Sequence, residues 1–455
     1  MGKRKVLVAN RGEIAVRVIN ACKDLGIETV LVVSEADEES MGAQMADEVV
    51  CIGPPQAALS YLNIPKIIET ALDTGADAIH PGYGFLAENS GLPEACEQSG
   101  IIFVGPRSKI MRELGDKISA RNLARKSNVP MTEGSEGLRG FEDVEAEVQK
   151  TGFPVIFKAA AGGGGRGMRI VREQKDLKNA FDMASNEAQK AFGDGTLFVE
   201  RYVQNARHVE VQIIGDNFGN IVHLGSRDCS SQRRHQKVIE EALPPNLPDD
   251  LLNRILDSAV VLTADIGYNN AATVEFLVDE DRNEFYFMEV NTRIQVEHPV
   301  SEEITGIDLV KEQIQVAYGA PISVKQEDIK FQGHAIECRI TAEDAKDDFW
   351  PSPGTITEFA SPSGNNVRLD THCYDGYVVG PFYDSMIAKL ITTGDTREEA
   401  LANMKTALGT FRIEGIKTNI NFLRFVIEQP EFVAGKISTN WLENTVLPKF
   451  LASLN

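Results

Sequence analysis

The sequence predicts a mixed α/β and α+β fold with an N-terminal doubly wound parallel sheet, a central second strand system and a C-terminal mixed domain. Three observations support this prediction. Short apolar strands alternate with amphipathic helical segments over residues 1 to about 110, which is typical of a parallel sheet with helices on both faces. More strands follow as far as Asn291, and the turn-rich stretches Pro351–Gly354 and Ser361–Gly364 then mark a third region.

The first region predicts a regular alternation of strands and helices. A helix follows the first strand because Ile14, Val18 and Cys22 recur at helical spacing, and Gly26 has the position of a residue just past a helix end. The expected elements are strand Lys5–Ala9, that helix, strand Glu28–Val33, strand Val49–Ile52, a helix after Ile64, strand Ala78–His80, a helix after Ala87 and strand Ile101–Val104. No glycine-rich fingerprint follows the first strand, so dinucleotide binding is not expected here.

The central region begins with a predicted hinge, the loop-rich stretch Pro130–Gly140. Strand Pro154–Ala160 is followed by the glycines of residues 162–167 and by strand Met168–Val171, so the glycines sit in a hairpin and do not form a Walker loop. They are either a mobile turn or a flap whose N–H groups cover phosphates. The remaining expected elements are strands Leu197–Val203, Val209–Gly215, Ile221–Leu224, Thr273–Val278 and Glu284–Asn291, a helix around residues 250–266, and helices near residues 397–409 and 417–428.

The composition is that of an ordinary globular chain. Hydrophobic residues make up 42% and charged residues 25% of its 455 residues, and the formal net charge is −21. An acidic surface repels nucleic-acid phosphates and anionic lipid, so we expect neither a nucleic acid nor a membrane as a partner. No apolar run approaches the roughly 18 residues of a membrane span, and no signal peptide is present, so we expect a cytoplasmic protein. The six cysteines form no CxxC pair, which argues against zinc and disulfides.

Polar and apolar residues alternate through the segment Phe285–Glu297. In an extended chain, residues two apart share a face, so Glu289, Asn291, Arg293, Gln295 and Glu297 would point the same way. The aromatic residues Phe285 and Phe287 would share that face. We therefore expect this surface to form the floor of a cleft.

Oxygen and nitrogen side chains around this segment predict a metal and phosphate site. Glu275, Glu289 and Asn291 offer the oxygen ligands that Mg²⁺ prefers, in the manner of a two-metal clamp on a nucleoside triphosphate. Cations for the phosphates are available from Lys117, from Lys158 at the end of an apolar strand, and from the run Arg233–Lys237.

The chain resembles the biotin carboxylase family of ATP-grasp ligases along essentially its whole length. The similarity rests on seven stretches in order: Val8–Ala15, His80–Leu86, Gly162–Met168, Arg227–Ser230, Gln232–Glu241, Glu289–Val300 and Gly333–Arg339. The resemblance implies a Rossmann-like N-terminal domain over residues 1–114, an ATP-grasp domain over residues 115–334 with a mobile lid at about residues 131–203, and a C-terminal domain over residues 335–455.

The resemblance also implies how the chain holds its nucleotide and metal. Lys117, Lys158, His208 and the glycine flap would hold the ATP phosphates, while Glu200 and Val203 would contact the adenine side. Glu275, Glu289 and Asn291 would hold Mg²⁺, or Mn²⁺ in its place. The full set implied for ATP is Lys117, Lys158, Gly163, Gly164, Gly165, Glu200, Val203, His208, Gln232 and His235.

A second set of side chains is implied for bicarbonate, biotin and catalysis. Lys237, Arg293, Glu297 and Arg339 would be catalytic, with Glu297 as the general base and Arg339 stabilising the biotin enolate. Gln232 and His235 would also lie where biotin meets carboxyphosphate. The bicarbonate and biotin set is Tyr83, Lys237, Arg293, Gln295, Val296, Glu297 and Arg339.

The implied activity is the ATP- and Mg-dependent carboxylation of biotin by bicarbonate, through carboxyphosphate. Biotin would arrive as a substrate on a separate carrier protein, a carboxyltransferase subunit would take the carboxyl group onward, and the chain would form a homodimer. Two alternatives remain at this point. One is another ATP-grasp ligase that joins a carboxylate to an amine, and the other is a nucleotide-binding subunit without turnover.

Overall fold

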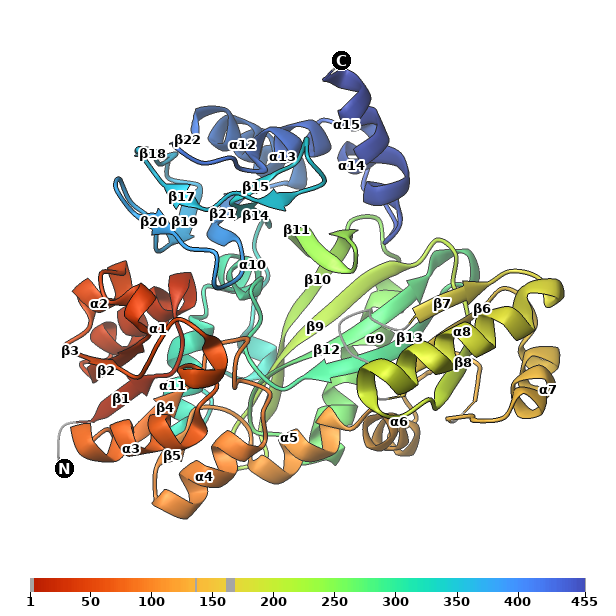
Figure 1. Cartoon of the computed structure of the whole chain (residues 1–455), viewed down its shortest axis with the longest axis horizontal. Coiled ribbons are helices and arrows are strands. Elements are labelled where there is room, and N and C mark those ends of the chain that lie inside the picture. Colours follow the sequence, from red (N-terminus) through yellow and green to blue (C-terminus); the bar gives the residue numbers. More distant parts are fainter. Residues whose placement is uncertain (1–3, 136, 161–167, 455) are drawn as a thin grey trace.

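A computed structural model of the chain describes residues 4–135, 137–160 and 168–454. The N-terminal elements lie on the left of Figure 1, a small sheet and two helices lie on the right, and the C-terminal elements lie above. Long strands of one large sheet run between these parts. The fold is mixed α/β, as predicted.

The N-terminal region is a five-stranded parallel sheet in the order β3-β2-β1-β4-β5. Helix α1 packs on one face, where Ile14, Val18 and Ile19 are buried, and α3 and α4 pack on the other, so the predicted doubly wound sheet is confirmed. The elements are β1 Lys5–Val8, α1 Gly12–Asp24, β2 Glu28–Val33, η1 Glu35–Asp37, α2 Met41–Met45, β3 Glu48–Cys51, η2 Ala57–Leu59, α3 Ile64–Thr74, β4 Ala78–His80, α4 Gly91–Ser99, β5 Ile102–Phe103 and α5 Ser108–Gly115.

Gly26 follows α1 with φ +67°, the left-handed conformation that favours glycine just past a helix end. The helix expected after Ala87 begins at Gly91.

The central sheet has eight antiparallel strands in the order β13-β12-β9-β10-β11-β14-β21-β19. Strand β14 begins at His334 and pairs with β11, so one continuous sheet crosses the boundary expected between the second and third domains. The elements are β9 Arg207–Gly215, β10 Ile221–Arg233, β11 Gln236–Ala242, α9 Asp249–Asp265, β12 Asn270–Asp279, η3 Glu280–Arg282, β13 Glu284–Asn291, α10 His298–Thr305, α11 Leu309–Ala317, η4 Gln326–Asp328, β14 His334–Thr341, β19 Val367–Thr371 and β21 Met386–Gly394.

The hairpin of β10 and β11 corrects the expectation of a short strand ending at Leu224. Strand β10 continues to Arg233 because its partner β11 holds it along its second half. The polar residues from Ser226 to Arg233 hid this strand from an apolar pattern, although all of them are buried.

The part of the chain from β6 to β8 contains a three-stranded sheet in the order β7-β6-β8. One face packs on α7 and α8 through Val155, Phe157 and Val199. The opposite face carries Lys158, Phe198 and Glu200 toward the cleft described below. The elements are α6 Lys117–Lys126, α7 Phe141–Thr151, β6 Val155–Ala159, β7 Met168–Val171, α8 Gln174–Phe192 and β8 Leu197–Arg201.

The C-terminal region adds small sheets and helices to the end of the large sheet. A helix, α12, packs on β21 and β14, and its buried side chains share a core with Ile336 and Leu390. The elements are β15 Glu343–Asp344, β16 Trp350–Pro351, β17 Gly354–Thr355, β18 Glu358–Ala360, β20 Val378–Val379, α12 Arg397–Thr410, β22 Arg412–Glu414, α13 Ile420–Ile427, α14 Pro430–Val433, the π-helical turn η5 Leu442–Val446 and α15 Leu447–Ser453.

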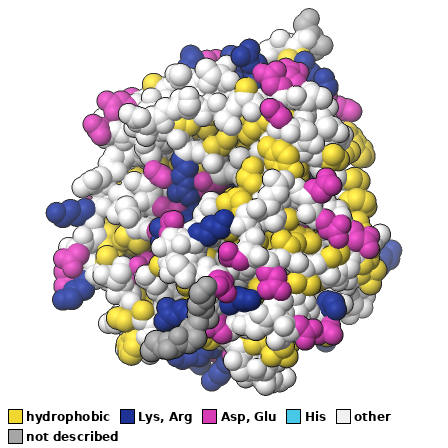
Figure 2. Space-filling model, turned by 90° about the vertical axis from the view of Figure 1, so that its left-hand side faces the viewer, with side chains coloured by type: hydrophobic (Ala, Val, Ile, Leu, Met, Phe, Trp, Pro, Cys, Tyr) yellow, Lys and Arg dark blue, Asp and Glu magenta, His cyan; other side chains and the backbone are white. Residues whose placement is uncertain are grey.

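Charged side chains of both signs are mixed over the face drawn in Figure 2. The described residues of this face therefore form no broad basic area of the kind that binds nucleic acid. Among the described helices, none is long and apolar enough to cross a membrane.

Candidate active site

A cleft of about 940 Å³ lies where the parts of the fold meet. Its walls come from α6, from the open face of the β6–β8 sheet, from the large sheet and from the C-terminal region. Its lining includes sixteen of the predicted site residues: Tyr83, Lys117, Lys158, Glu200, His208, Gln232, His235, Lys237, Glu275, Glu289, Asn291, Arg293, Gln295, Val296, Glu297 and Arg339.

The remaining predicted site residues fall elsewhere. Val203 is buried in a small cluster with Ala206 and Tyr286 and is not part of the cleft lining. Gly163, Gly164 and Gly165 lie outside the residues that the structure describes.

Three glutamates line up across neighbouring strands because of the sheet register. Glu275 on β12 lies opposite Glu210 on β9 and opposite Glu289 on β13. Residues opposite each other in a sheet project from the same face, so the three carboxyl groups converge on the cleft side. Glu210 and Glu275 are buried.

A β-bulge at Met288 overturns the expectation that Phe285 and Phe287 share a face with Glu289. The register shifts there by one residue, so that Phe287 pairs with Phe276 while Glu289 pairs with Glu275. Both phenylalanines therefore pack in the apolar core, where Phe287 also borders the cleft, and Glu289 points into the cleft.

Lys237 on β11 reaches across the sheet to the centre of this carboxylate group. Its ammonium pairs with Glu210, lies 3.0 Å from a Glu275 oxygen and 2.5 Å from a Glu297 oxygen. Burial lowers the pKa of Lys237, but the surrounding anionic groups more than offset this and leave it well above the usual value. Lys237 is therefore a permanent cation at neutral pH.

Glu297 is held between two cations. One oxygen accepts a hydrogen bond from Lys237, and the other accepts one from Arg339 Nη2 at 2.9 Å. Burial raises the pKa of this carboxyl, but Lys237, Arg339 and Arg227 lower it well below the usual value. Glu297 is thus a carboxylate at neutral pH, which is the form that a general base requires.

Arg339 on β14 also binds a second glutamate. Its Nε donates to Glu240 at 2.6 Å, so the guanidinium bridges Glu240 and Glu297. Burial raises the pKa of Glu240 to about 7, with Arg339 opposing this and Glu297 adding to it. The fork geometry of arginine fixes the plane of this side chain at the edge of the cleft.

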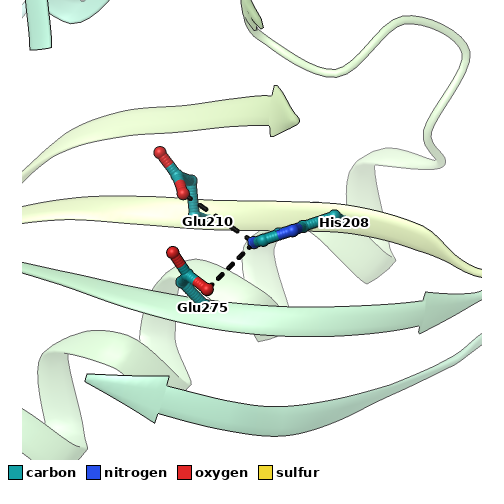
Figure 3. Close-up of side chains that lie close together, drawn as sticks. All are labelled: His208, Glu210 and Glu275. Carbon is teal, nitrogen blue, oxygen red and sulfur yellow. Dashed lines mark ion pairs between the residues drawn. The ribbon is translucent and has the colours of Figure 1, made fainter. Parts of the chain in front are cut away.

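His208 stands beside the carboxylate row on β9 (Figure 3). Its Nε2 lies 3.2 Å from Glu275 and 3.9 Å from Glu210. Burial lowers the pKa of His208, but the nearby Glu275 raises it by more, so the pKa lies above its usual value. Although His208, Glu210 and Glu275 bring possible ligand atoms within 4.8 Å of one another, Lys237 already pairs with both glutamates.

The segment after β13 is not extended, contrary to expectation. The strand ends at Asn291, and a turn leads to α10, with Glu297 just before the helix. The turn still brings the predicted groups together, because Arg293 Nη2 donates to Asn291 at 3.0 Å and Gln295 Nε2 donates to Glu275 at 2.8 Å. A compact turn brings together side chains that an extended strand would only place on the same face.

The other end of the cleft is cationic. Lys117 and Arg121 lie one turn apart on α6, and Lys158 projects from β6. Lys158 donates to Glu200 at 2.6 Å, and burial lowers the pKa of Lys117. Three cations near a single buried carboxylate make this end suited to a polyanion.

The rim of the cleft includes the other predicted biotin-side residues. Tyr83 donates its hydroxyl to buried Glu13. Gln232 lies at the end of β10 with its amide 3.5 Å from His208, and His235 is exposed in the β10–β11 turn.

Two buried residues that support the site were not assigned a role from the sequence. Arg227 is fully buried and donates hydrogen bonds to Glu210, Gln212, Thr273, Gln295 and Ser301. Glu210 forms ion pairs with both Arg227 and Lys237. The signal for Glu210 was available in the sequence, since His208, Glu210 and Gln212 repeat every second residue among the valines and isoleucines of a buried strand.

The predicted metal ligands fit a hard divalent cation. Glu275 and Glu289 are paired across adjacent strands, and Asn291 adds an amide oxygen. Glu289 is open to the cleft, and partial desolvation there raises its pKa, which the neighbouring Glu275 raises further. Such repulsion between two carboxylates is relieved when a cation binds between them.

Comparison with known proteins gives matches over nearly the whole chain. Residues 2–111 match the family model for the biotin carboxylase N-terminal domain, residues 116–325 the ATP-binding domain of the carbamoyl-phosphate synthase L chain, and residues 337–444 the biotin carboxylase C-terminal domain. Biotin carboxylase 1 of Bacillus subtilis (strain 168) is 51% identical over 97% of this chain and 98% of its own.

Two solved structures show the same fold. A biotin carboxylase complex with β,γ-ATP from Campylobacter jejuni has a TM-score of 0.93 and 48% identity over 97% of this chain and 98% of its own. The biotin carboxylase domain dimer of the Hydrogenobacter thermophilus 2-oxoglutarate carboxylase, in complex with MgADP, ADP and bicarbonate, has a TM-score of 0.91 and 46% identity over 97% of both chains.

Proposed function

Because the chain belongs to the biotin carboxylase family of ATP-dependent ligases, we propose that its cleft uses ATP to activate bicarbonate and transfers the carboxyl group to biotin on a separate carrier protein. One observation carries this proposal. Glu297 lies between Lys237 and Arg339, next to the paired carboxylates Glu275 and Glu289, so a base, two cations and a metal-ligand set share one cleft.

We propose that the cationic end of the cleft holds the nucleotide. Lys117, Lys158 and His208 would contact the phosphates, and Glu200 would face the adenine side. Glu275, Glu289 and Asn291 would hold Mg²⁺ or Mn²⁺, which when bound offsets the charge of the transferring phosphoryl group. The nucleotide and bicarbonate bound in the Hydrogenobacter thermophilus relative support this assignment.

In the first step, bicarbonate would bind among Arg293, Gln295 and the backbone of Val296. Glu297 accepts its proton while the bicarbonate oxygen attacks the γ-phosphate, which gives ADP and carboxyphosphate. Lys237 stabilises the negative charge that develops on the oxygens during this transfer. Lys389 donates a hydrogen bond to the Val296 carbonyl at 3.0 Å and so fixes this part of the turn.

In the second step, carboxyphosphate yields CO₂ and phosphate, and the phosphate takes the proton from biotin N1′. Arg339 stabilises the resulting enolate oxygen, and the biotin nitrogen then attacks CO₂. Tyr83, Gln232 and His235 at the rim would contact the incoming biotin. The bridge from Arg339 to Glu240 keeps the guanidinium in the plane that this role requires.

The proposed partners are a biotin carboxyl carrier protein and a carboxyltransferase subunit, and we propose a homodimer like that of the Hydrogenobacter thermophilus relative. We also propose the division into functional units at residues 1–114, 115–334 and 335–455, with the lid at about 131–203. The cysteines Cys22, Cys51, Cys96, Cys229, Cys338 and Cys373 are all free thiols, which supports our proposal of a reducing, cytoplasmic location.

The deciding experiment measures ADP release by the purified chain with MgATP, bicarbonate and free biotin. We expect ADP release to require bicarbonate and to rise with biotin. Release without bicarbonate, but dependent on an added carboxylate and amine, would favour another ligase of the same fold. ATP binding with no ADP release under any of these conditions would indicate a subunit without turnover.

A further inference from the structure

Glu200 is the most heavily paired carboxylate at the cationic end of the cleft. It is buried on β8 and accepts hydrogen bonds from three groups on three different segments. Lys158 on β6 donates to Oε2 at 2.6 Å, Thr132 donates to Oε2 at 2.9 Å, and Arg121 on α6 donates to Oε1 at 2.7 Å.

If the proposed function is right, on which this inference rests, Lys158 must both pair with Glu200 and bind a nucleotide phosphate. In this structure its ammonium is committed to Glu200. To bind a phosphate it must turn away, although its side chain is only one-third exposed. A buried carboxylate that loses its cation is costly, so the departure of Lys158 needs a second cation on Glu200.

We propose that Arg121 is a positioning residue for nucleotide binding: it keeps Glu200 paired with a cation, so that Lys158 is free to turn to the nucleotide phosphates. Arg121 acts through Glu200 and Lys158 and is not itself a phosphate ligand.

The geometry of Arg121 suits this task. It approaches Glu200 through the oxygen that Lys158 does not use, so the two cations do not compete for one acceptor. Its guanidinium also lies 5.7 Å from the centre of the Phe198 ring, which sits two residues before Glu200 on the same face of β8. A planar guanidinium anchored at two points keeps its position when Lys158 moves.

The test compares ligands with and without phosphates on the full chain. For Arg121→Met we expect the Kd for ADP to rise about 10- to 100-fold, because Lys158 then remains on Glu200. The Kd for adenosine should change less than about threefold, since adenosine makes no demand on Lys158. The KM for MgATP should rise by a larger factor than kcat falls, and Arg121→Lys should restore most of the affinity.

The same substitution in a Glu200→Gln variant tests whether Arg121 acts through Glu200. With Glu200→Gln, no carboxylate competes for Lys158, so adding Arg121→Met should change the Kd for ADP less than about twofold. Arg125→Met is the matched control, because Arg125 lies one turn further along α6, is exposed and donates to Asn122 outside the cleft.

Three results would overturn the inference. Equal losses for adenosine and ADP would make Arg121 a direct contact of the base, an undiminished effect in the Glu200→Gln background would remove the route through Glu200, and unchanged ADP affinity would remove the role altogether. A wild-type chain that binds no ADP would instead contradict the proposed function, so the two failures are distinguishable. A melting temperature for each variant, with Arg121→Lys as the conservative change, separates these outcomes from misfolding.

Discussion

At the scale of single residues, Glu297 is the side chain whose surroundings say most about its chemistry. Both of its oxygens are used, one by Lys237 and one by Arg339, and the carboxyl is buried. These two cations keep it ionised and aim it at the space in front of Lys237. A substitution that keeps the shape but removes the charge therefore tests the role of the base directly.

For Glu297→Gln we expect turnover to fall about 10²- to 10⁴-fold, or about 2.7 to 5.5 kcal/mol of transition-state stabilisation, because an amide cannot accept the bicarbonate proton. Nucleotide affinity should change far less. The measurement is biotin-dependent ADP release at saturating bicarbonate, with MgATP binding measured separately. Near-normal turnover would show that another group takes the proton.

Two other glutamate-to-glutamine variants serve as comparisons for Glu297→Gln. Glu289→Gln removes a proposed metal ligand, so it should raise the Mg²⁺ concentration needed for half-maximal turnover, which Glu297→Gln should leave almost unchanged. Glu302 is also buried and paired with two arginines, Arg17 and Arg368, but lies outside the cleft lining. Glu302→Gln should therefore reduce turnover much less than Glu297→Gln.

Arg227 offers a prediction about stability at the same scale. It is fully buried and its guanidinium donates to five side chains around the carboxylate row. Arg227→Met should lower the free energy of unfolding by about 3 to 5 kcal/mol, because Glu210 and its neighbours lose their buried donor. Urea unfolding of the two proteins measures this, and a loss below about 1 kcal/mol would contradict the central position given to Arg227.

At the scale of elements, side chains of β8 join the β6–β8 sheet to the rest of the molecule, and Arg201 of β8 pairs with Asp279 of β12 at 3.2 Å. Arg121 and Thr132 bridge to Glu200, and two isolated backbone bridges tie the segment after Pro130 to β8. We propose that this sheet moves as a unit about the Pro130–Gly140 segment.

We expect an ATP analogue to slow amide hydrogen exchange over β6, β7 and β8, because the nucleotide would hold this sheet against α6 and the large sheet. Exchange in α12, remote from the cleft, serves as the internal reference. Unchanged protection in the β6–β8 sheet at saturating analogue would contradict the proposed lid.

The helix α12 carries the only Met-Lys pair of the sequence, Met404-Lys405. A biotin attachment site needs such a lysine in an exposed hairpin, whereas Lys405 lies within a helix and pairs with Glu428 at 2.7 Å. We therefore expect no covalent biotin on this chain, with a biotinylated carrier protein as the positive control. Intact-mass spectrometry after expression with biotin ligase would contradict this if it detected the added mass of biotin.

At the scale of the whole molecule, buried carboxylates give stability a defined dependence on pH. The ordinary pKa of 4.5 for Glu200 is raised by burial, but Lys158 and Arg121 lower it to about 2 in the folded protein. A carboxyl whose pKa is lower in the folded than in the unfolded state stabilises the fold above its unfolded pKa. That stability is lost as the pH falls toward the folded pKa.

We therefore expect Glu200→Gln to flatten the acid side of the stability curve. Between pH 5 and pH 3 the wild-type chain should lose about 2 kcal/mol more of its free energy of unfolding than the variant does, since protonation of Glu200 in the unfolded chain contributes that amount. Urea unfolding at the two pH values is the measurement. An equal loss in both proteins would show that Glu200 does not carry this linkage.

The sequence by itself determined the elements of the N-terminal sheet and most of the chemistry. Apolar strands and helical spacing predicted the N-terminal parallel sheet, because its inner strands β1, β2 and β4 are buried on both faces and are therefore mostly apolar. The seven motif stretches indicated the family, and the predicted site residues include sixteen side chains that line one cleft. Local patterns are sufficient for these features because the spacing of buried residues and the motif side chains can both be read from short stretches of sequence.

Only the tertiary structure decided how these side chains meet. The bulge at Met288 turned Glu289 away from Phe287, the turn after Asn291 replaced the expected extended run, and Lys237 reached three glutamates from separate elements. Strand β11 and the polar half of β10 were missed because a strand rich in charged residues has no apolar signature. Register, turns and cross-strand ion pairs join residues far apart in the chain, and their energies depend on partners that no local window contains.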